Sequence, residues 1–75
     1  MVELIEYIAK SLVDDPSQVH VTETVHGETV TLELEVAQED MGRIIGKNGR
    51  VANAMRTLVR VVASNEGKRA NLDIL

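Results

Sequence analysis

The sequence predicts an α+β fold with its elements in the order helix, strand, strand, helix, helix, strand. Three observations lead to this prediction. Apolar residues recur at intervals of three and four in two parts of the chain, two other segments alternate between apolar and polar residues, and the whole chain has only 75 residues. A chain of this length folds as one small domain. Its core has to be aliphatic, because Tyr7 is the only aromatic residue.

The first predicted element is an amphipathic helix over residues 3–13. Its apolar positions lie three or four residues apart and are Leu4, Ile5, Ile8, Ala9, Leu12 and Val13. We expect the helix to end near the segment DDPS, because proline disfavours helical angles in the residue before it.

Two antiparallel strands are predicted next, because the segments VHVTETV and TVTLELEVA alternate between apolar and polar residues. Gly27 stands between the two segments, which is typical of a hairpin turn. In the second segment the alternation predicts one buried side, made of Val30, Leu32, Leu34 and Val36. The other side is made of Thr29, Thr31, Glu33 and Glu35.

Two helices and a strand are predicted for the rest of the chain. The segment QEDMGRIIG is a short helix with Glu39 and Asp40 near its positive N-terminal end, and Gly46 ends it. Its apolar face is made of Met41, Ile44 and Ile45. The longest helix covers residues 50–63, with an apolar stripe made of Val51, Ala54, Met55, Leu58, Val61 and Val62. SNEGK is a loop, and RANLDIL alternates as a third strand.

Charge is distributed unevenly along the chain. The formal net charge is −4, but the window 41–65 holds five of the eight Lys and Arg residues and no Asp or Glu. Its charge is therefore +5, which leaves −9 for the rest of the chain. Because a charged partner responds to the local field over about 8–10 Å, this asymmetry predicts one basic side that can bind an anionic polymer.

Several classes of function are excluded by composition. The chain has no cysteine, which excludes disulfides, zinc knuckles and iron–sulfur ligation. No pair of carboxylates, nucleophile with base, or metal-ligand cluster stands out, so we predict no enzyme activity, no cofactor and no metal site. His20 and His26 are expected to be exposed near the hairpin. Glu3 and Glu6 lie where a signal peptide would be positive, and no segment reaches transmembrane length, so we expect a cytoplasmic protein.

The segment Gly46-Lys47-Asn48-Gly49 lies between the two predicted helices. For an isolated G-x-x-G, a helix cap followed by a turn is the more frequent structure. Its surroundings favour a phosphate site instead, because a basic helix begins immediately and helix N-termini attract anions. The segment does not fit a P-loop, which needs four residues between its glycines and then Lys-Ser/Thr, or the dinucleotide fingerprint G-x-G-x-x-G.

On these residues the sequence resembles the KH domain family, whose hallmark is an apolar pair followed by G-x-x-G between two helices, here IIGKNGRV. The element order is similar to the type II arrangement, and residues 1–75 are identified as a single KH domain. In size the chain resembles the small bacterial KhpA (YlqC) family. The resemblance implies a three-stranded sheet with the helices packed on one face.

The same resemblance implies a function in binding single-stranded RNA, with single-stranded DNA as a further ligand, as a post-transcriptional regulator or RNA chaperone. It implies that the RNA-binding residues are Arg43, Ile44, Ile45, Gly46, Lys47, Asn48, Gly49, Arg50 and Val51. The loop residues would hold backbone phosphates, and the apolar residues would anchor the loop and line an aliphatic groove. Val30, Leu32 or Leu34 is expected on the facing strand.

Two questions stay open at this point. Arg56 and Arg60 lie four residues apart on the long helix, and an ordinary solvated helix face accounts for them as well as RNA binding does. The alternative function is a protein-interaction module that forms a homodimer or pairs with a second KH-containing protein of the KhpB (Jag) kind, as the resemblance implies. Val59, beside the main apolar stripe, is the expected contact for that module.

Overall fold

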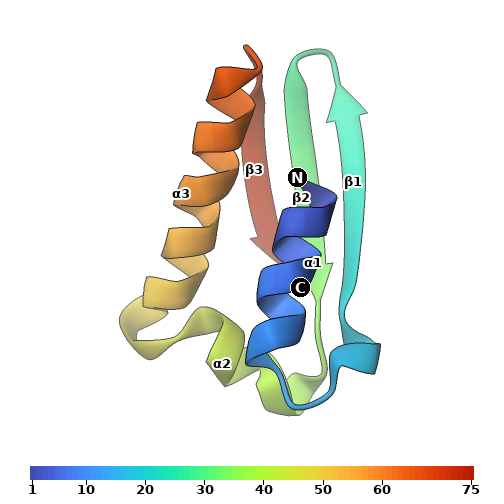
Figure 1. Cartoon of the computed structure of the whole chain (residues 1–75), viewed down its shortest axis with the longest axis vertical. Coiled ribbons are helices and arrows are strands. Elements are labelled where there is room, and N and C mark those ends of the chain that lie inside the picture. The colour runs from blue at the N-terminus through green and yellow to red at the C-terminus, as the bar shows by residue number, and fades with distance from the viewer.

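The computed structural model describes all 75 residues and contains three helices and three strands (Figure 1). The helices are α1 (Val2–Leu12), α2 (Met41–Ile45) and α3 (Arg50–Asn65), and the strands are β1 (His20–His26), β2 (Thr29–Glu35) and β3 (Arg69–Ile74). This order confirms the predicted order and the α+β class. Single turns of 3₁₀ helix, which were not predicted, lie at Pro16–Gln18, Gln38–Asp40 and Lys47–Gly49. No helix combines the length and the apolar character that crossing a membrane requires.

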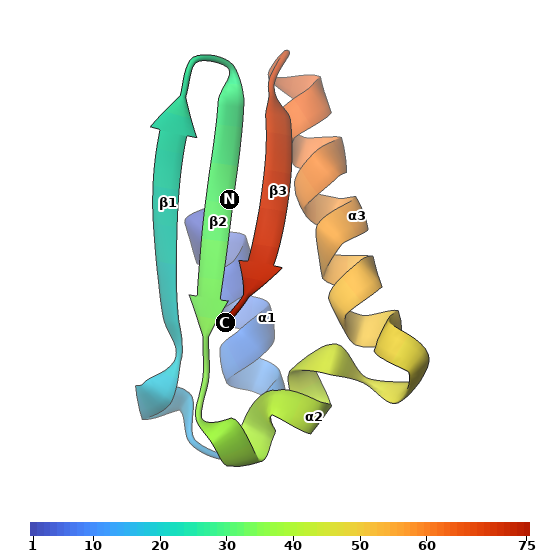
Figure 2. The same cartoon turned by 180° about the vertical axis from the view of Figure 1, so that it is seen from behind.

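The sheet has the strand order β1-β2-β3, so that β2 is central and both of its neighbours are edge strands (Figure 2). β1 and β2 form the predicted antiparallel hairpin, with Val25 opposite Val30, and Gly27 supplies the positive φ of its turn. β2 and β3 are parallel, with Val30 opposite Ala70. Parallel neighbours need a long crossover, which here contains α2 and α3.

The helices lie on one side of the sheet and leave its other face open (Figures 1 and 2). In β2 the residues that face the helices are Val30, Leu32 and Leu34, and all three are buried. In β3 the corresponding residues are Ala70 and Leu72. The predicted alternation is therefore confirmed. The open face carries only polar side chains from β2 and β3, namely Thr29, Thr31, Glu33, Glu35, Arg69, Asn71 and Asp73.

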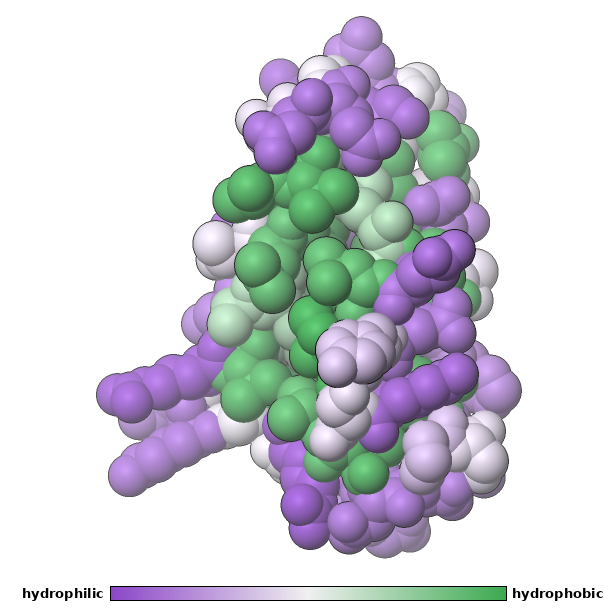
Figure 3. All heavy atoms as spheres, in the orientation of Figure 1, coloured by the Kyte–Doolittle hydropathy of each residue, from purple (hydrophilic) through white to green (hydrophobic).

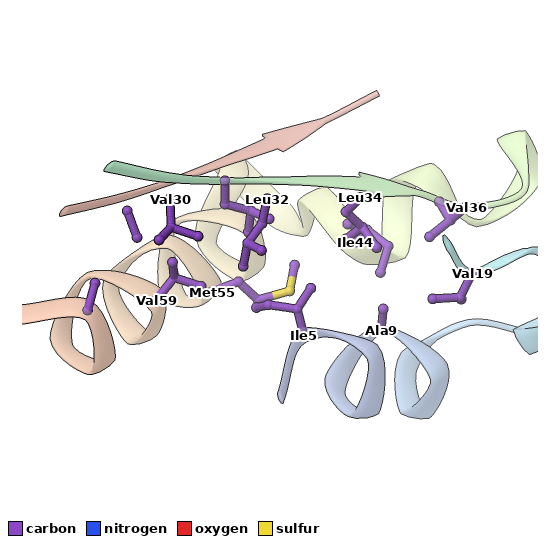
Figure 4. Close-up of a cluster of buried hydrophobic side chains, with 13 residues drawn as sticks. Ile5, Ala9, Val19, Val30, Leu32, Leu34, Val36, Ile44, Met55 and Val59 are labelled. Carbon is purple, nitrogen blue, oxygen red and sulfur yellow. The ribbon is translucent and has the colours of Figure 1, made fainter. Parts of the chain in front are cut away.

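The core lies between the sheet and the helices (Figure 4). α1 contributes Ile5 and Ala9, and α2 contributes Ile44. The buried residues of α3 are Ala52, Met55, Val59 and Ala63. Burying aliphatic side chains stabilises the fold by roughly 1.5–3 kcal/mol for each large residue, and every large side chain in this core is aliphatic or methionine.

The apolar stripe expected on α3 coincides only in part with the face that meets the sheet. Of its members only Met55 is buried, whereas Leu58 and Val61 are 44% and 52% exposed. Apolar residues cover more than one face of this helix, so helical spacing alone did not decide which face meets the sheet. The face that does so carries Ala52 and Ala63, whose small side chains let the helix approach the strands closely. Val59 belongs to this face and is fully buried, so it cannot be the contact of a protein-interaction surface.

Asp40 fixes the end of the sheet nearest α2 by reaching across to the α1–β1 connection. Its side chain is buried, and its two carboxylate oxygens accept hydrogen bonds from the backbone N–H groups of Asp14 and Asp15, each at 3.1 Å. It makes no side-chain cap on α2 itself. Hydrogen bonds to a buried charged acceptor contribute about 1.5–3 kcal/mol each. This contact therefore holds α2, and the loop that follows it, against the rest of the domain.

Candidate nucleic-acid interface

The loop Gly46–Gly49 joins α2 to α3 and has an irregular backbone. Three of its residues have positive φ angles, which are +75° at Gly46, +58° at Asn48 and +75° at Gly49. Among residue types other than glycine, asparagine is one of those that best tolerate a positive φ, because its short side chain can hydrogen-bond locally. The glycine and asparagine positions of the motif are therefore accounted for by the local conformation of the loop.

The two glycines of the loop have different structural roles. A Cβ at Gly46 would lie 2.5 Å from Cγ2 of Val51 and 2.9 Å from its backbone nitrogen, so a side chain cannot fit between the loop and α3. A Cβ at Gly49 would meet nothing closer than Nδ2 of Asn53 at 3.8 Å. Gly46 thus allows close packing within the protein. Gly49 leaves open space beside the main chain, where a ligand can approach.

The N-terminus of α3 faces this loop without a side-chain cap. A helix N-terminus carries partial positive charge and unsatisfied N–H groups, which favour a phosphate or another anion. Lys47 and Arg50 lie beside it, both exposed, and neither takes part in an ion pair. Two free cations and a helix N-terminus without a side-chain cap are thus brought together at one place.

Arg43 differs from the other predicted cations because it is already paired. Its Nη2 lies 3.2 Å from a carboxylate oxygen of Asp14, and its Nε lies 3.9 Å from Asp40. The charge of Arg43 is thereby partly neutralised. It supports the contact between α2 and the α1–β1 connection, and its role as an RNA contact stays a prediction.

The apolar residues of the motif divide into a core residue and surface residues. Ile44 is fully buried and anchors α2, whereas Ile45 is 41% exposed and Val51 is half-buried against Gly46. Only the last two can line a binding surface. Val30, Leu32 and Leu34, expected on the facing strand, lie in the core, so that expectation is wrong for all three.

A groove that the sequence did not reveal runs between α3 and β3. It has a volume of about 280 Å³ and is lined mainly by Thr31, Arg56, Arg60, Asn71, Leu72 and Asp73. Nε of Arg56 donates to the backbone oxygen of Leu72 at 3.2 Å, so Arg56 reaches across the groove to the free edge of β3. The groove is polar and basic, which differs from the expected aliphatic lining. The sequence shows that Arg56 and Arg60 share one face of the helix. It does not show that β3 lies opposite them, because that depends on the order of the strands in the sheet.

Comparisons with known proteins agree with this architecture. A family model described as "KhpA/KhpB, KH domain" matches residues 2–74. The chain is 52% identical over 75 residues to the RNA-binding protein KhpA of Clostridium perfringens, with both chains covered completely. It is 48% identical to the RNA-binding protein KhpA of Listeria monocytogenes serovar 1/2a, covering 100% of this chain and 99% of that protein. The protein of the same name from Chlamydia trachomatis is 45% identical over 75 residues, with 96% of it covered. No solved structure matches the chain.

Proposed function

This chain belongs to the KhpA/KhpB KH-domain family, and on that premise we propose that it binds single-stranded RNA by holding the sugar-phosphate backbone at the loop Gly46–Gly49. The observation that carries the proposal is the juxtaposition of the α3 N-terminus, which has no side-chain cap, with the unpaired Lys47 and Arg50. The whole chain then acts as one KH domain. Relatives that match it over nearly their full length are named RNA-binding proteins, which supports this ligand.

The path of the RNA follows from the position of the groove. A strand whose phosphates lie at the loop can continue along α3, where Arg56 and Arg60 add positive charge. The free edge of β3 forms the opposite wall and presents main-chain groups that can hydrogen-bond a base. Contacts to the phosphate backbone carry no sequence information, so binding at the loop is tolerant of sequence, as suits a cytoplasmic RNA chaperone or post-transcriptional regulator without catalytic activity.

The clamp is tested with the double variant Lys47→Asp, Asn48→Asp. Two carboxylates in place of a cation and an amide would repel the phosphates, and aspartate tolerates the positive φ at position 48 better than most residues. Fluorescence anisotropy with a labelled single-stranded RNA library should show that the parent binds and that its affinity falls with salt. Each phosphate contact should contribute roughly −0.7 to the slope of the logarithm of the association constant against the logarithm of the salt concentration. The variant should lose at least tenfold in affinity.

A matched control separates the loop from the overall charge. The variant Lys10→Glu, Gln18→Glu changes the net charge by the same amount at exposed positions on α1 and the turn after it. It should bind RNA within about twofold of the parent at 0.15 M salt, where screening acts over about 8 Å. Circular dichroism establishes equal folding of all three proteins. Unchanged binding by the loop variant would show that the clamp is wrong.

We propose homodimerisation as a second function, because a hydrophobic band is exposed on the helical side of the molecule (Figure 3). It lies between α1 and α3. The exposed large apolar residues of α3 are Leu58 and Val61. Contiguous apolar surface of this kind marks an interaction site. A second copy would cover the band, and two linked RNA sites would raise avidity by about 10²–10⁴ where one RNA spans both.

Dimerisation is tested by sedimentation of the parent and the variant Leu58→Lys across a dilution series. Leu58 is exposed, so the lysine leaves the fold intact but places a charge in the band. We expect a dimer for the parent at micromolar concentration and a monomer for the variant, with Gln18→Lys as the charge-matched control. A parent that is monomeric throughout would overturn self-association. Mass gained only with a KhpB-like protein would identify that protein as the occupant instead.

A further inference from the structure

A second hollow lies at the end of α3 that is remote from the loop Gly46–Gly49. It is lined by Arg60, Ser64, Lys68, Arg69, Ala70 and Asn71. Three of these residues also line the α3–β3 groove, so the two hollows form one continuous depression. The family motif does not include this region, and of its residues only Arg60 lies on the RNA path proposed above.

The charge of this hollow is strongly positive for so acidic a chain. Arg60, Lys68 and Arg69 all contribute cations, and no Asp or Glu lines the hollow. None of the three forms an ion pair, although the chain has more acidic than basic residues and Glu66 lies in the same loop. Three unpaired cations repel one another at close range, which makes an anion between them favourable.

The backbone that carries these cations is held firmly. The N–H of Lys68 donates to the oxygen of Ala63 at 2.8 Å, and Gly67, at a φ of +69°, closes the end of α3. The N–H of Arg69 donates to the oxygen of Glu28 at 2.9 Å, which starts β3. The positions of both residues are therefore set by secondary structure before any ligand arrives.

From these observations we infer that the hollow at Arg60, Lys68 and Arg69 is a second phosphate site, which holds RNA that extends beyond the nucleotides at the loop. This inference rests on the proposed function. Along the axis of α3, the first helical residue and Ser64 are about 21 Å apart. At the rise of about 3.4 Å per nucleotide of a stacked strand, this corresponds to roughly six nucleotides. A tetranucleotide held at the loop therefore leaves the hollow empty, whereas an octanucleotide reaches it.

The experiment compares RNA of 4, 8 and 12 randomised nucleotides, bound to the parent and to the variant Lys68→Gln, Arg69→Thr. The slope of affinity against salt is the main readout, because a longer strand gains affinity simply by offering more registers. For 12-nucleotide RNA the variant should lose about 1.4 from the slope, since two contacts contribute about 0.7 each. If the variant and the parent bind equally at 1 M salt, this difference in slope makes the affinity of the variant roughly 25-fold lower than that of the parent at 0.1 M salt. For the tetranucleotide the slope should not change.

Two controls separate a phosphate site in the hollow from effects of overall charge and of helix stability. Lys10→Glu alters the net charge equally and should leave the length dependence intact. Cations at a helix C-terminus also stabilise the helix dipole, by about 0.3–1 kcal/mol. If that were their only role, the variant would melt at a lower temperature but bind RNA of all three lengths as the parent does, and the second site would be wrong.

The outcomes also separate this inference from the proposed function. An equal salt slope of the parent for 4 and 12 nucleotides would overturn the second site and leave the clamp standing. Binding of the Lys47→Asp, Asn48→Asp variant at parental affinity would overturn the clamp itself. Both sites would be supported if the Lys68→Gln, Arg69→Thr variant and the Lys47→Asp, Asn48→Asp variant each bound 12-nucleotide RNA more weakly than the parent, while only the second variant lost binding of the tetranucleotide.

Discussion

Gly42 and Gly46 lie four residues apart, one inside α2 and one at its end, and their surroundings are opposite. A Cβ at Gly42 would meet no atom within 4 Å, and its backbone is helical. A Cβ at Gly46 would collide with the side chain and the backbone of Val51, at a φ of +75°. The same substitution at these two positions should therefore change stability in opposite directions.

We expect Gly46→Ala to lower the free energy of unfolding by about 2–4 kcal/mol, from backbone strain together with overpacking. Gly42→Ala should raise it by about 0.4–1 kcal/mol, because alanine loses less backbone freedom in a helix. Urea denaturation followed by circular dichroism measures both. Equal stability of the two variants would show that the collision with Val51 relaxes at no cost.

At this scale the sequence located the loop but not the partners of its residues. The motif and its basic surroundings singled out Gly46, Lys47, Gly49 and Arg50, and the structure brings these together at the start of α3. The pairing of Arg43 with Asp14 joins residues 29 positions apart, which no local pattern contains. The hydrogen bond from Arg56 to the backbone oxygen of Leu72, at the free edge of β3, could not be predicted from a local pattern either.

At the scale of elements, α3 has one apolar face that meets the sheet and another that meets solvent. Val59 is fully buried on the first, and Leu58 is 44% exposed on the second, although the two are adjacent in sequence. Adjacent residues on a helix point about 100° apart, so only one of them can face the sheet.

Truncating each residue to alanine tests this orientation. Val59→Ala removes two buried methyl groups and should cost about 1.5–3 kcal/mol of unfolding free energy. Leu58→Ala should cost less than about 0.5 kcal/mol when measured on the monomer at high dilution. Thermal melts at several concentrations provide the comparison. A larger loss from Leu58→Ala in dilute protein would mean that α3 is rotated from the described position.

The strands were predictable because β2 has one buried and one open face, which imposes strict alternation on its residues. α3 was predictable as a helix but not in its rotation, because two of its faces are apolar. The single turns of 3₁₀ helix are too short to create any period. Asp40 illustrates a further limit, since its place near a helix N-terminus is predictable from the sequence, whereas its hydrogen bonds to the distant Asp14 and Asp15 are not.

On the scale of the whole molecule, the fold gathers cations that the sequence leaves apart. Lys68 and Arg69 lie outside the basic window 41–65, yet the turn at Gly67 that closes α3 brings them beside Arg60. The acidic residues Glu33 and Glu35 lie on the open face of the sheet. The element order was predictable from local patterns, and the strand order that creates the basic groove was not.

The parallel pairing of β2 with β3 also has a consequence for how the protein folds. The β1–β2 hairpin closes over a tight turn, and hairpins of this kind form in about 1–10 μs. β3 can join β2 only after the chain has passed through α2 and α3, and such distant contacts are slow because the intervening segment must first be ordered. We therefore expect the groove wall to assemble last. A strand of RNA that contacts both α3 and β3 would then stabilise the part of the fold that forms last. RNA binding and completion of the fold would therefore reinforce each other.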